Sequence, residues 1–251
     1  MRSAVRILGV DVDAVTMAEA VEMICDAVDA RRGHGGPVLQ VATVNPEFVM
    51  RARRDQRFRE VLRGAGLRTA DGVGLSLAAR LLGARLPERV TGVELVRGLA
   101  RAAAARGQRL FLLGAAPGVA EVAAQRLKVE APGLEIAGTL SGQAGEAGDA
   151  ESLAAVRAAR ADVVLVAFGA PAQEEWSARN LEVSGAAVGI GVGGTFDYLS
   201  GRVRRAPAWM RRAGLEWLFR LVREPWRARR MSVLPVFMGL VALQRLGLGR
   251  R

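Results

Sequence analysis

Short apolar or β-branched runs alternate along the chain with longer segments whose apolar residues recur at helical spacing. The longer segment Met17–Ala30 has 3.6-residue periodicity, and Thr16 and Glu19 are spaced as a capping box at its start. Strands are predicted at Val5–Leu8, Val38–Val44, Leu67–Ala70, Arg109–Leu113, Leu134–Gly138, Asp162–Phe168 and Ala187–Gly191. Further helices are predicted at Leu95–Arg106, Val119–Val129, Glu151–Ala161 and Ala172–Leu181.

This alternation of strands and helices predicts an α/β fold with a Rossmann-like, mostly parallel sheet flanked by helices. The composition changes near Gly201, which predicts an α/β catalytic domain over residues 1–201. Residues 202–251 are then expected to form a basic, amphipathic, helical appendage. In a parallel sheet of this kind, ligands bind beyond the carboxyl ends of the strands.

The positive charge is confined to that appendage. Residues 202–251 carry 13 of the 36 basic side chains and two of the 25 acidic ones. The whole chain has a net charge of +11, so residues 1–201 taken together are neutral. The appendage is also rich in Trp, Leu, Val and Met, a combination suited to an anionic, apolar surface. The longest uncharged runs, Val183–Phe196 and Met231–Gln244, have 14 residues, short of the roughly 18 that span a bilayer. We expect a cytoplasmic protein bound peripherally to the membrane.

Three rare residue types exclude several classes of chemistry. Cys25 is the only cysteine and lies in a helical segment, so we expect a small buried hydrophobe rather than a disulfide or thiolate metal site. His34 is the only histidine and lies in a glycine-rich segment predicted to be a loop, which argues against a histidine triad or zinc site. Lys128 does not follow glycine, so there is no P-loop. A catalyst here must be a carboxylate supported by arginines and backbone amides.

Polar and small residues follow five of the predicted strands. They would lie together at one edge of the sheet and form a cleft. The alternative is that these Asn, Asp, Gly and Pro residues form turns or helix caps. The residues concerned are Asn45, Asp71, Gly114, Gly169 to Glu174, and Gly191 to Asp197.

An ordered series of short motifs from about Leu8 to Arg230 resembles the WecG/TagA/CpsF glycosyltransferases. One departure is Ala172, where that family commonly carries lysine. The motifs are Thr43-x-Asn45, Ala70-Asp71-Gly72, Glu88-Arg89-Val90-Thr91-Gly92, Gly169-x-Pro171-x-Gln173-Glu174, Gly191-x-Gly193-Gly194-x-Phe196-Asp197, Arg205-Ala206-Pro207 and Gly214-Leu215-Glu216-Trp217-Leu218-Phe219-Arg220.

The resemblance implies transfer of a sugar from a UDP-sugar to an N-acetylglucosaminyl-diphospho-lipid, with inversion, with no cofactor and with no metal. N-acetylmannosamine is the leading donor sugar, and its uronic acid, glucose and galactose stay open. By resemblance Asp71 is the base that takes the proton of the acceptor hydroxyl. The residues alone equally allow Asp71 to cap a helix beginning at Val73.

The resemblance also assigns residues to three binding roles. The substrate-binding residues are Thr43, Asn45, Arg89, Gln173 and Glu174, and the nucleotide-binding residues are Gly114, Gly191, Gly193, Gly194 and Asp197. The matching arginines for the lipid diphosphate and the membrane are Arg220, Arg227 and Arg230. Solvated ion pairs, turns and caps are the corresponding alternatives for these residues.

Other readings of the sequence predict different partners. The net charge suggests a nucleic-acid-binding protein, but the neutral body and the absence of a recognition motif argue against nucleic acid. A Rossmann-type oxidoreductase binds its dinucleotide with a Gly-x-Gly-x-x-Gly motif, and the turn after the first predicted strand lacks this motif. Asp11-Val12-Asp13 fits an Asp-x-Asp metal motif but lies in a segment predicted to be a turn. The apolar appendage also makes a homo-oligomer possible.

Overall fold

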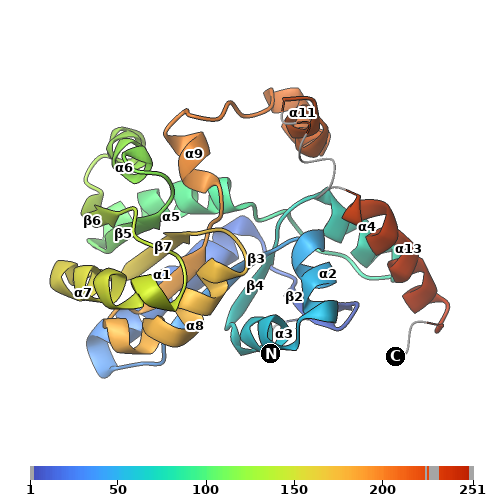
Figure 1. The fold of residues 1–251 in the computed structure, drawn as a ribbon, viewed down its shortest axis with the longest axis horizontal. Helices are drawn as coiled ribbons and strands as arrows, with labels where there is room; N and C mark the ends of the chain where they lie inside the picture. Colours follow the sequence, from blue (N-terminus) through green and yellow to red (C-terminus); the bar gives the residue numbers. More distant parts are fainter. Residues whose placement is uncertain (1–2, 224, 226–231, 249–251) are drawn as a thin grey trace.

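The computed structural model describes residues 3–223, 225 and 232–248, and its centre is a six-stranded parallel sheet (Figure 1). The strand order is β4-β3-β8-β7-β5-β6. The strands are β3 (Leu39–Val44), β4 (Leu67–Ala70), β5 (Arg109–Gly114), β6 (Glu135–Leu140), β7 (Val163–Ala167) and β8 (Val188–Gly191).

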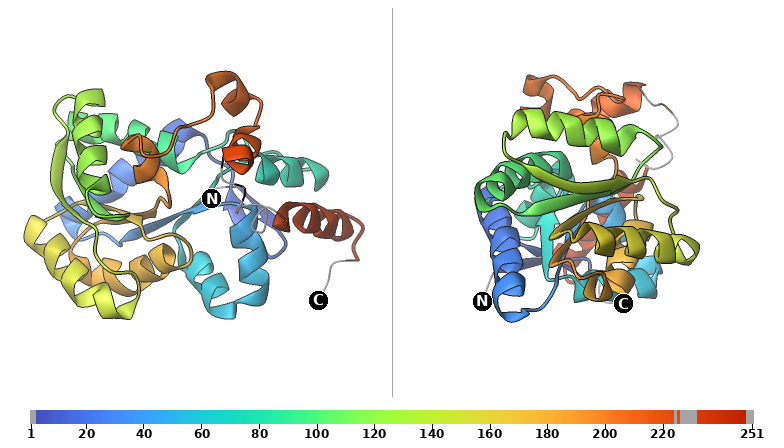
Figure 2. Two further views of the ribbon diagram at one scale, coloured as in Figure 1. Left: turned by 45° about the horizontal axis from the view of Figure 1, so that its top comes forward. Right: turned by 90° about the vertical axis from the view of Figure 1, so that its left-hand side faces the viewer.

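Helices cover both faces of this sheet, because side chains of successive strand residues point to opposite faces. Leu110 and Leu112 pack with α1 (Met17–His34), α5 (Gly92–Arg106) and α6 (Val119–Glu130) on one face. Phe111 and Leu113 pack on the other face with α7 (Asp149–Ala159) and α8 (Ala172–Ser184), around the buried Trp176. The two views of Figure 2 show the sheet between these layers.

A second hydrophobic cluster lies beyond the β4 edge of the sheet. It is built on an antiparallel hairpin of β1 (Ala4–Ile7) and β2 (Val10–Asp13). The other members are α2 (Pro46–Arg54), α3 (Gln56–Gly64), α4 (Val73–Leu81) and α13 (Val233–Arg245).

The C-terminal segments lie on two sides of the molecule. Short helices α9 (Thr195–Leu199), α10 (Ala208–Arg212) and α11 (Glu216–Arg223) follow β8, while α13 contacts α2 and α4 (Figure 1). Phe237 and Val241 of α13 are fully buried in the second cluster. The Gln244 amide donates to the carbonyl of Arg6 at 3.0 Å and accepts from the backbone N–H of Leu8 at 2.8 Å. The helix α13 therefore shares its core with the N-terminal hairpin. Within the described part of the chain, no helix is both long and apolar enough to cross a membrane.

The predicted α/β class, with a mostly parallel sheet and flanking helices, is confirmed. The capping box at Thr16 and Glu19 and the burial of Cys25 are also confirmed. Two local predictions are wrong. His34 is the last residue of α1, since the left-handed Gly35 ends that helix. Asp11 to Asp13 form strand β2 rather than a turn, because the tight bend lies at Leu8 and Gly9, both with positive φ.

Candidate active site

The carboxyl ends of β4, β3, β8, β7 and β5 lie in that order along one edge of the sheet. The residues predicted for the cleft follow these strands directly. Asp71 follows β4, Asn45 follows β3, and Gly191 ends β8, with Gly193 and Gly194 just after it. Parallel pairing of β4 with β3 and of β3 with β8 makes these three exits neighbours.

Asp71 lies at the exit of β4, where its backbone N–H donates to the carbonyl of Val44 at 2.7 Å. Gly72, with φ of +93°, is the N-cap of α4. The side chain of Asp71 is therefore not the cap of the helix that begins at Val73. Its carboxylate accepts instead from the backbone N–H of Gly92, the first residue of α5. Asp71 thus faces the positive end of the α5 dipole.

Burial makes the Asp71 carboxyl a weaker acid than an ordinary aspartate, because it raises the pKa of this carboxyl to about 6. The N–H of Gly92 lowers the pKa, the charge of Glu216 raises it, and the charges of Arg205 and Arg89 lower it. A carboxylate with a pKa near 6 is mostly ionised at pH 7 and accepts a proton more readily than an ordinary aspartate. Asp71 therefore has the properties of a general base.

Arginines from two parts of the chain surround this carboxylate. Arg89 donates through Nη2 to the carbonyl of Arg211 at 3.0 Å, at the end of α10. Arg205 forms ion pairs with Glu94 in the first turn of α5 and with Glu216 in α11, at 3.3 Å for the latter. The residues after α9 therefore lie close enough to Asp71 for the charges of Arg205 and Glu216 to act on it.

Thr43 and Asn45 make hydrogen bonds inside the protein. The Thr43 hydroxyl donates to the carbonyl of Gly191 at 2.9 Å and so links β3 to β8. The side-chain carbonyl (Oδ1) of Asn45 caps α2 by accepting from the N–H of Phe48 at 3.1 Å. The donor of the Thr43 hydroxyl is thus used within the protein, while the side-chain NH₂ of Asn45 has no hydrogen-bond partner among the described residues.

Gln173 and Glu174 form a buried pair that holds two strand exits together. The side-chain Oε1 of Gln173 accepts from the N–H groups of Gly169 at 3.1 Å and Gly193 at 2.9 Å, and its side-chain NH₂ donates to Oε1 of Glu174 at 2.6 Å. Burial raises the pKa of Glu174 to about 8, although the hydrogen bond from Gln173 opposes the shift. This buried pair thereby holds the loops that follow β7 and β8 from the interior side of the protein.

Two of the predicted nucleotide-binding glycines are required by close packing. A Cβ on Gly191 would lie 2.3 Å from Oε1 of Glu174, and one on Gly114 would lie 2.8 Å from the backbone carbon of Ala167. Gly114 also has φ of +102°, in the left-handed region that side chains avoid.

The other residues predicted to bind the nucleotide lie in the loop after β8 and in α9. Gly193 and Gly194 precede α9, and Asp197 lies within it, 4.0 Å from the guanidinium of Arg202.

Of the predicted tail arginines, the structure places one. The guanidinium of Arg220 lies 5.0 Å from the ring centre of Tyr198 in a cation–π contact. Arg227 and Arg230 lie outside the described residues.

The sequence does not predict a site role for Arg205 or for three residues in contact with it. Arg205 and Glu216 stand in motifs that carried the resemblance, but Glu94 and Tyr198 stand in patterns typical of ordinary helices. Periodicity cannot reveal contacts between residues so distant along the chain. Over the described ranges, no group of three or more His, Cys, Asp or Glu side chains is placed to hold a metal ion.

Comparison with known proteins matches the chain with one family over almost its full length. The model of the Glycosyl transferase WecG/TagA/CpsF family matches residues 5–251. An N-acetylglucosaminyldiphosphoundecaprenol N-acetyl-beta-D-mannosaminyltransferase from Bacillus subtilis (strain 168) is 37% identical over 199 residues, which cover 78% of this chain and 76% of the relative. A protein of the same name from Staphylococcus aureus (strain MW2) is 31% identical over 241 residues, 95% of this chain and 92% of the relative. This chain therefore belongs to the WecG/TagA/CpsF family of glycosyl transferases.

Proposed function

We propose that the protein transfers N-acetylmannosamine from its UDP conjugate to N-acetylglucosaminyl-diphospho-undecaprenol, with inversion at the anomeric carbon and without a metal. The sugar and the lipid acceptor are those in the names of the relatives from Bacillus subtilis and Staphylococcus aureus. The nucleotide and the stereochemistry follow from the resemblance in the motifs. The product would serve the synthesis of a cell-surface polymer such as teichoic acid.

The single observation that carries this proposal is the position of the partly buried Asp71 carboxylate, which lies at the strand-exit edge and accepts from the N–H of Gly92. In the proposed step an acceptor hydroxyl oxygen bonds to the anomeric carbon, and its proton passes to Asp71. The bond from that carbon to the phosphate oxygen breaks, and its electron pair leaves with UDP. Attack opposite the leaving group inverts the configuration. A positioned base of this kind contributes roughly 10²–10⁴-fold to the rate.

Positive groups beside Asp71 would stabilise the departing diphosphate. Arg89 uses Nη2 for the carbonyl of Arg211, and its other guanidinium nitrogens make no hydrogen bond within the described part of the chain. The N-terminus of α5 and the amides of the loop after β8 add positive dipoles at the same edge. Preorganised charges of this type act without a metal ion. We assign binding of the ribose hydroxyls to Asp197 and binding of polar groups on the transferred sugar to the side-chain NH₂ of Asn45.

The C-terminal segment is proposed to hold the enzyme on the cytoplasmic face of the membrane. Trp209 of α10 and Val222 of α11 are 63% and 74% exposed, and arginines stand between them along the chain. Exposed apolar side chains among basic ones suit an anionic leaflet, where each basic group adds about 1 kcal/mol. The variant Trp209→Ser/Val222→Ser should therefore bind phosphatidylglycerol vesicles more weakly. Val129→Ser, at an 80% exposed apolar position of α6, is the matched control.

The activity is tested by measuring UDP release from UDP-N-acetylmannosamine with a short-chain N-acetylglucosaminyl-diphospho-lipid. We expect turnover by the natural chain and a loss of at least about 100-fold in Asp71→Asn. Equal thermal unfolding of the two proteins shows that the loss is chemical. Asp197→Asn should instead raise KM for the donor. Absence of turnover across a panel of UDP-sugars, or full turnover by Asp71→Asn, would refute the proposal.

A further inference from the structure

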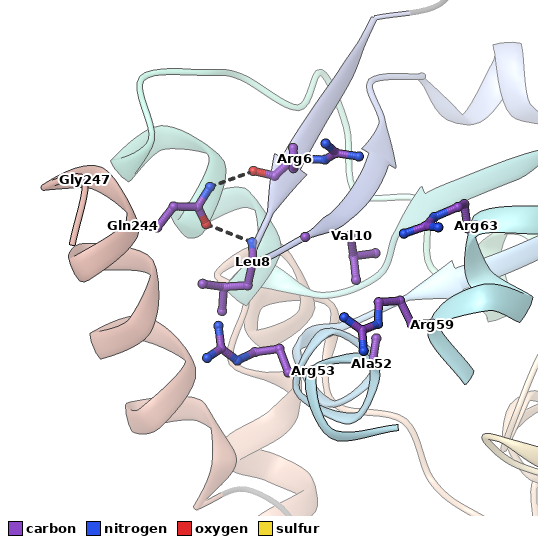
Figure 3. A pocket seen from close by; sticks show the side chains of 10 residues that line it. Arg6, Leu8, Val10, Ala52, Arg53, Arg59, Arg63, Gln244 and Gly247 are labelled. Carbon is purple, nitrogen blue, oxygen red and sulfur yellow. Dashed lines mark hydrogen bonds between the residues drawn. The ribbon is translucent and has the colours of Figure 1, made fainter. Parts of the chain in front are cut away.

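A basic pocket lies outside the candidate active site, between the tip of the β1–β2 hairpin, the corner between α2 and α3, and the end of α13 (Figure 3). Its volume is about 940 Å³. Four arginines line it, and none of its lining residues is among those that surround Asp71. The arginines are Arg6, Arg53, Arg59 and Arg63.

Most of the positive charge in this pocket is not neutralised by the protein. Arg6 pairs with Asp11 at 2.9 Å. Within the described ranges, Arg53, Arg59 and Arg63 have no acidic side chain at ion-pair distance, and no Asp or Glu lines the pocket. Arg59 and Arg63 are also four residues apart in α3, so their like charges face the same side and repel each other.

Several arginines elsewhere on the body are neutralised by acidic partners. Arg106, for example, binds Glu22, Asp26 and Asp29 at distances of 2.5 to 3.0 Å. A concave surface that collects unpaired charge of one sign concentrates the electric field and attracts counter-ions. The repulsion among the pocket arginines would be relieved by a bound anion.

The shape of the pocket is fixed by the fold. Its apolar wall consists of Leu8, Val10 and Ala52, of which Val10 and Ala52 are buried in the second hydrophobic cluster. The two hydrogen bonds of Gln244, shown in Figure 3, fasten the end of α13 to the hairpin on either side of Ile7. The ligand would therefore meet a preformed site.

We propose that this pocket binds a phosphate-bearing anion. The planar guanidinium group matches phosphate oxygens with two parallel hydrogen bonds, which makes arginine the preferred residue for phosphates. Pockets of roughly 300–1,000 Å³ hold whole organic ligands, so this one has room for a diphosphate with an organic substituent. The phosphate can come from a soluble diphosphate or from a lipid headgroup. Leu243 and Leu246, exposed on the adjoining end of α13, would face the lipid in the second case.

The experiment compares Arg59→Gln/Arg63→Gln with a control that loses the same charge. Arg57→Gln/Arg101→Gln removes two exposed arginines, one of them also on α3, and neither lines the pocket. Binding of inorganic diphosphate is measured by calorimetry with saturating UDP present. Binding to vesicles is measured by co-sedimentation with phosphatidylglycerol and with phosphatidylcholine. Thermal unfolding checks that both variants fold. If the pocket variant does not fold, Arg53→Gln replaces it and Arg54→Gln serves as its control.

Each outcome decides the proposal. A diphosphate affinity at least about tenfold weaker in the pocket variant than in the control supports a soluble ligand. Loss of phosphatidylglycerol binding in the pocket variant alone, with little diphosphate binding by the natural chain, supports a lipid headgroup. Equal effects of the two variants on both probes, or no effect of either, would overturn the proposal.

Discussion

Arg205 binds the carboxylate of Glu94 and thereby fastens the segment after α9 to the first turn of α5. Burial opposes ionisation of Glu94, but the hydrogen bond and charge of Arg205, with Arg97 and Arg211, lower its pKa, so this pair is ionised at neutral pH. Arg205 also pairs with Glu216 and acts on the charge of Asp71. The C-terminal segment therefore helps to set the basicity of the candidate catalytic carboxylate.

The pH dependence of activity should report this influence. Asp71 acts as a base only when deprotonated, so kcat/KM should rise with pH through about 6 and then level off. Arg205→Gln removes a charge that lowers the pKa, so its midpoint should move to higher pH. Glu216→Gln removes a charge that raises the pKa, so its midpoint should move to lower pH.

The two variants are distinguished by measuring kcat/KM between about pH 4.5 and 9, a range that contains the shifted pKa of Asp71 and extends to the expected plateau. Arg101→Gln, an exposed change on α5, should keep the natural midpoint. Shifts of the same sign in Arg205→Gln and Glu216→Gln would contradict the assignment of Asp71 as the titrating group.

Glu174 should make stability fall as the pH rises. Its pKa of about 8 in the folded chain lies above the ordinary value of 4.5, so the folded state holds this proton more tightly than the unfolded state. The free energy of unfolding should therefore decrease between about pH 4.5 and 8, by at most about 1.4 kcal/mol per unit, and become level above that. Glu174→Gln, which stays neutral, should lose this slope.

Denaturant unfolding at several pH values measures the effect. Glu175→Gln removes a neighbouring charge that adds to the raised pKa of Glu174, so the slope should persist but end at a somewhat lower pH. A Glu174→Gln variant with the natural slope would show that Glu174 is ionised in the folded protein.

The sequence predicted all six strands of the main sheet and the edge that the candidate residues follow, because buried strands and polar strand exits leave strong local signals. It did not reveal that Thr43 bonds Gly191 or that Gln173 holds Gly169 and Gly193. A hydroxyl or amide suited to a sugar is equally suited to a backbone group. Only the positions of the neighbouring strands decide between these uses.

The C-terminal helix shows the same limit. The run from Val233 to Leu243 is apolar enough to suit a membrane interface, but its residues divide between two environments. Phe237 is fully buried against α2 and α4, whereas the adjacent Val236 is 51% exposed. Hydrophobicity alone does not distinguish a face that packs on the protein from one that faces outward.

The variant Phe237→Ala should therefore be strongly destabilised. Truncation of a buried phenylalanine leaves a cavity and costs about 3–5 kcal/mol. Val236→Ala, one position earlier, should change the free energy of unfolding by no more than about 0.5 kcal/mol. Urea denaturation of the two variants measures the difference. Small and equal effects would mean that α13 is not part of the folded core.

A methyl group added at Gly191 should disturb both stability and donor binding. The new Cβ would lie 2.3 Å from Oε1 of Glu174 and 2.7 Å from Nε2 of Gln173, and these buried side chains cannot move without releasing Gly193. Overpacking of this kind costs about 1–3 kcal/mol. Because the loop after β8 would shift, KM for the UDP-sugar should rise. Gly239→Ala is the matched control, since its Cβ meets nothing within 4 Å and alanine favours a helix by about 0.5–1 kcal/mol. If Gly191→Ala unfolds like Gly239→Ala and keeps the natural KM, the buried pair does not position the loop.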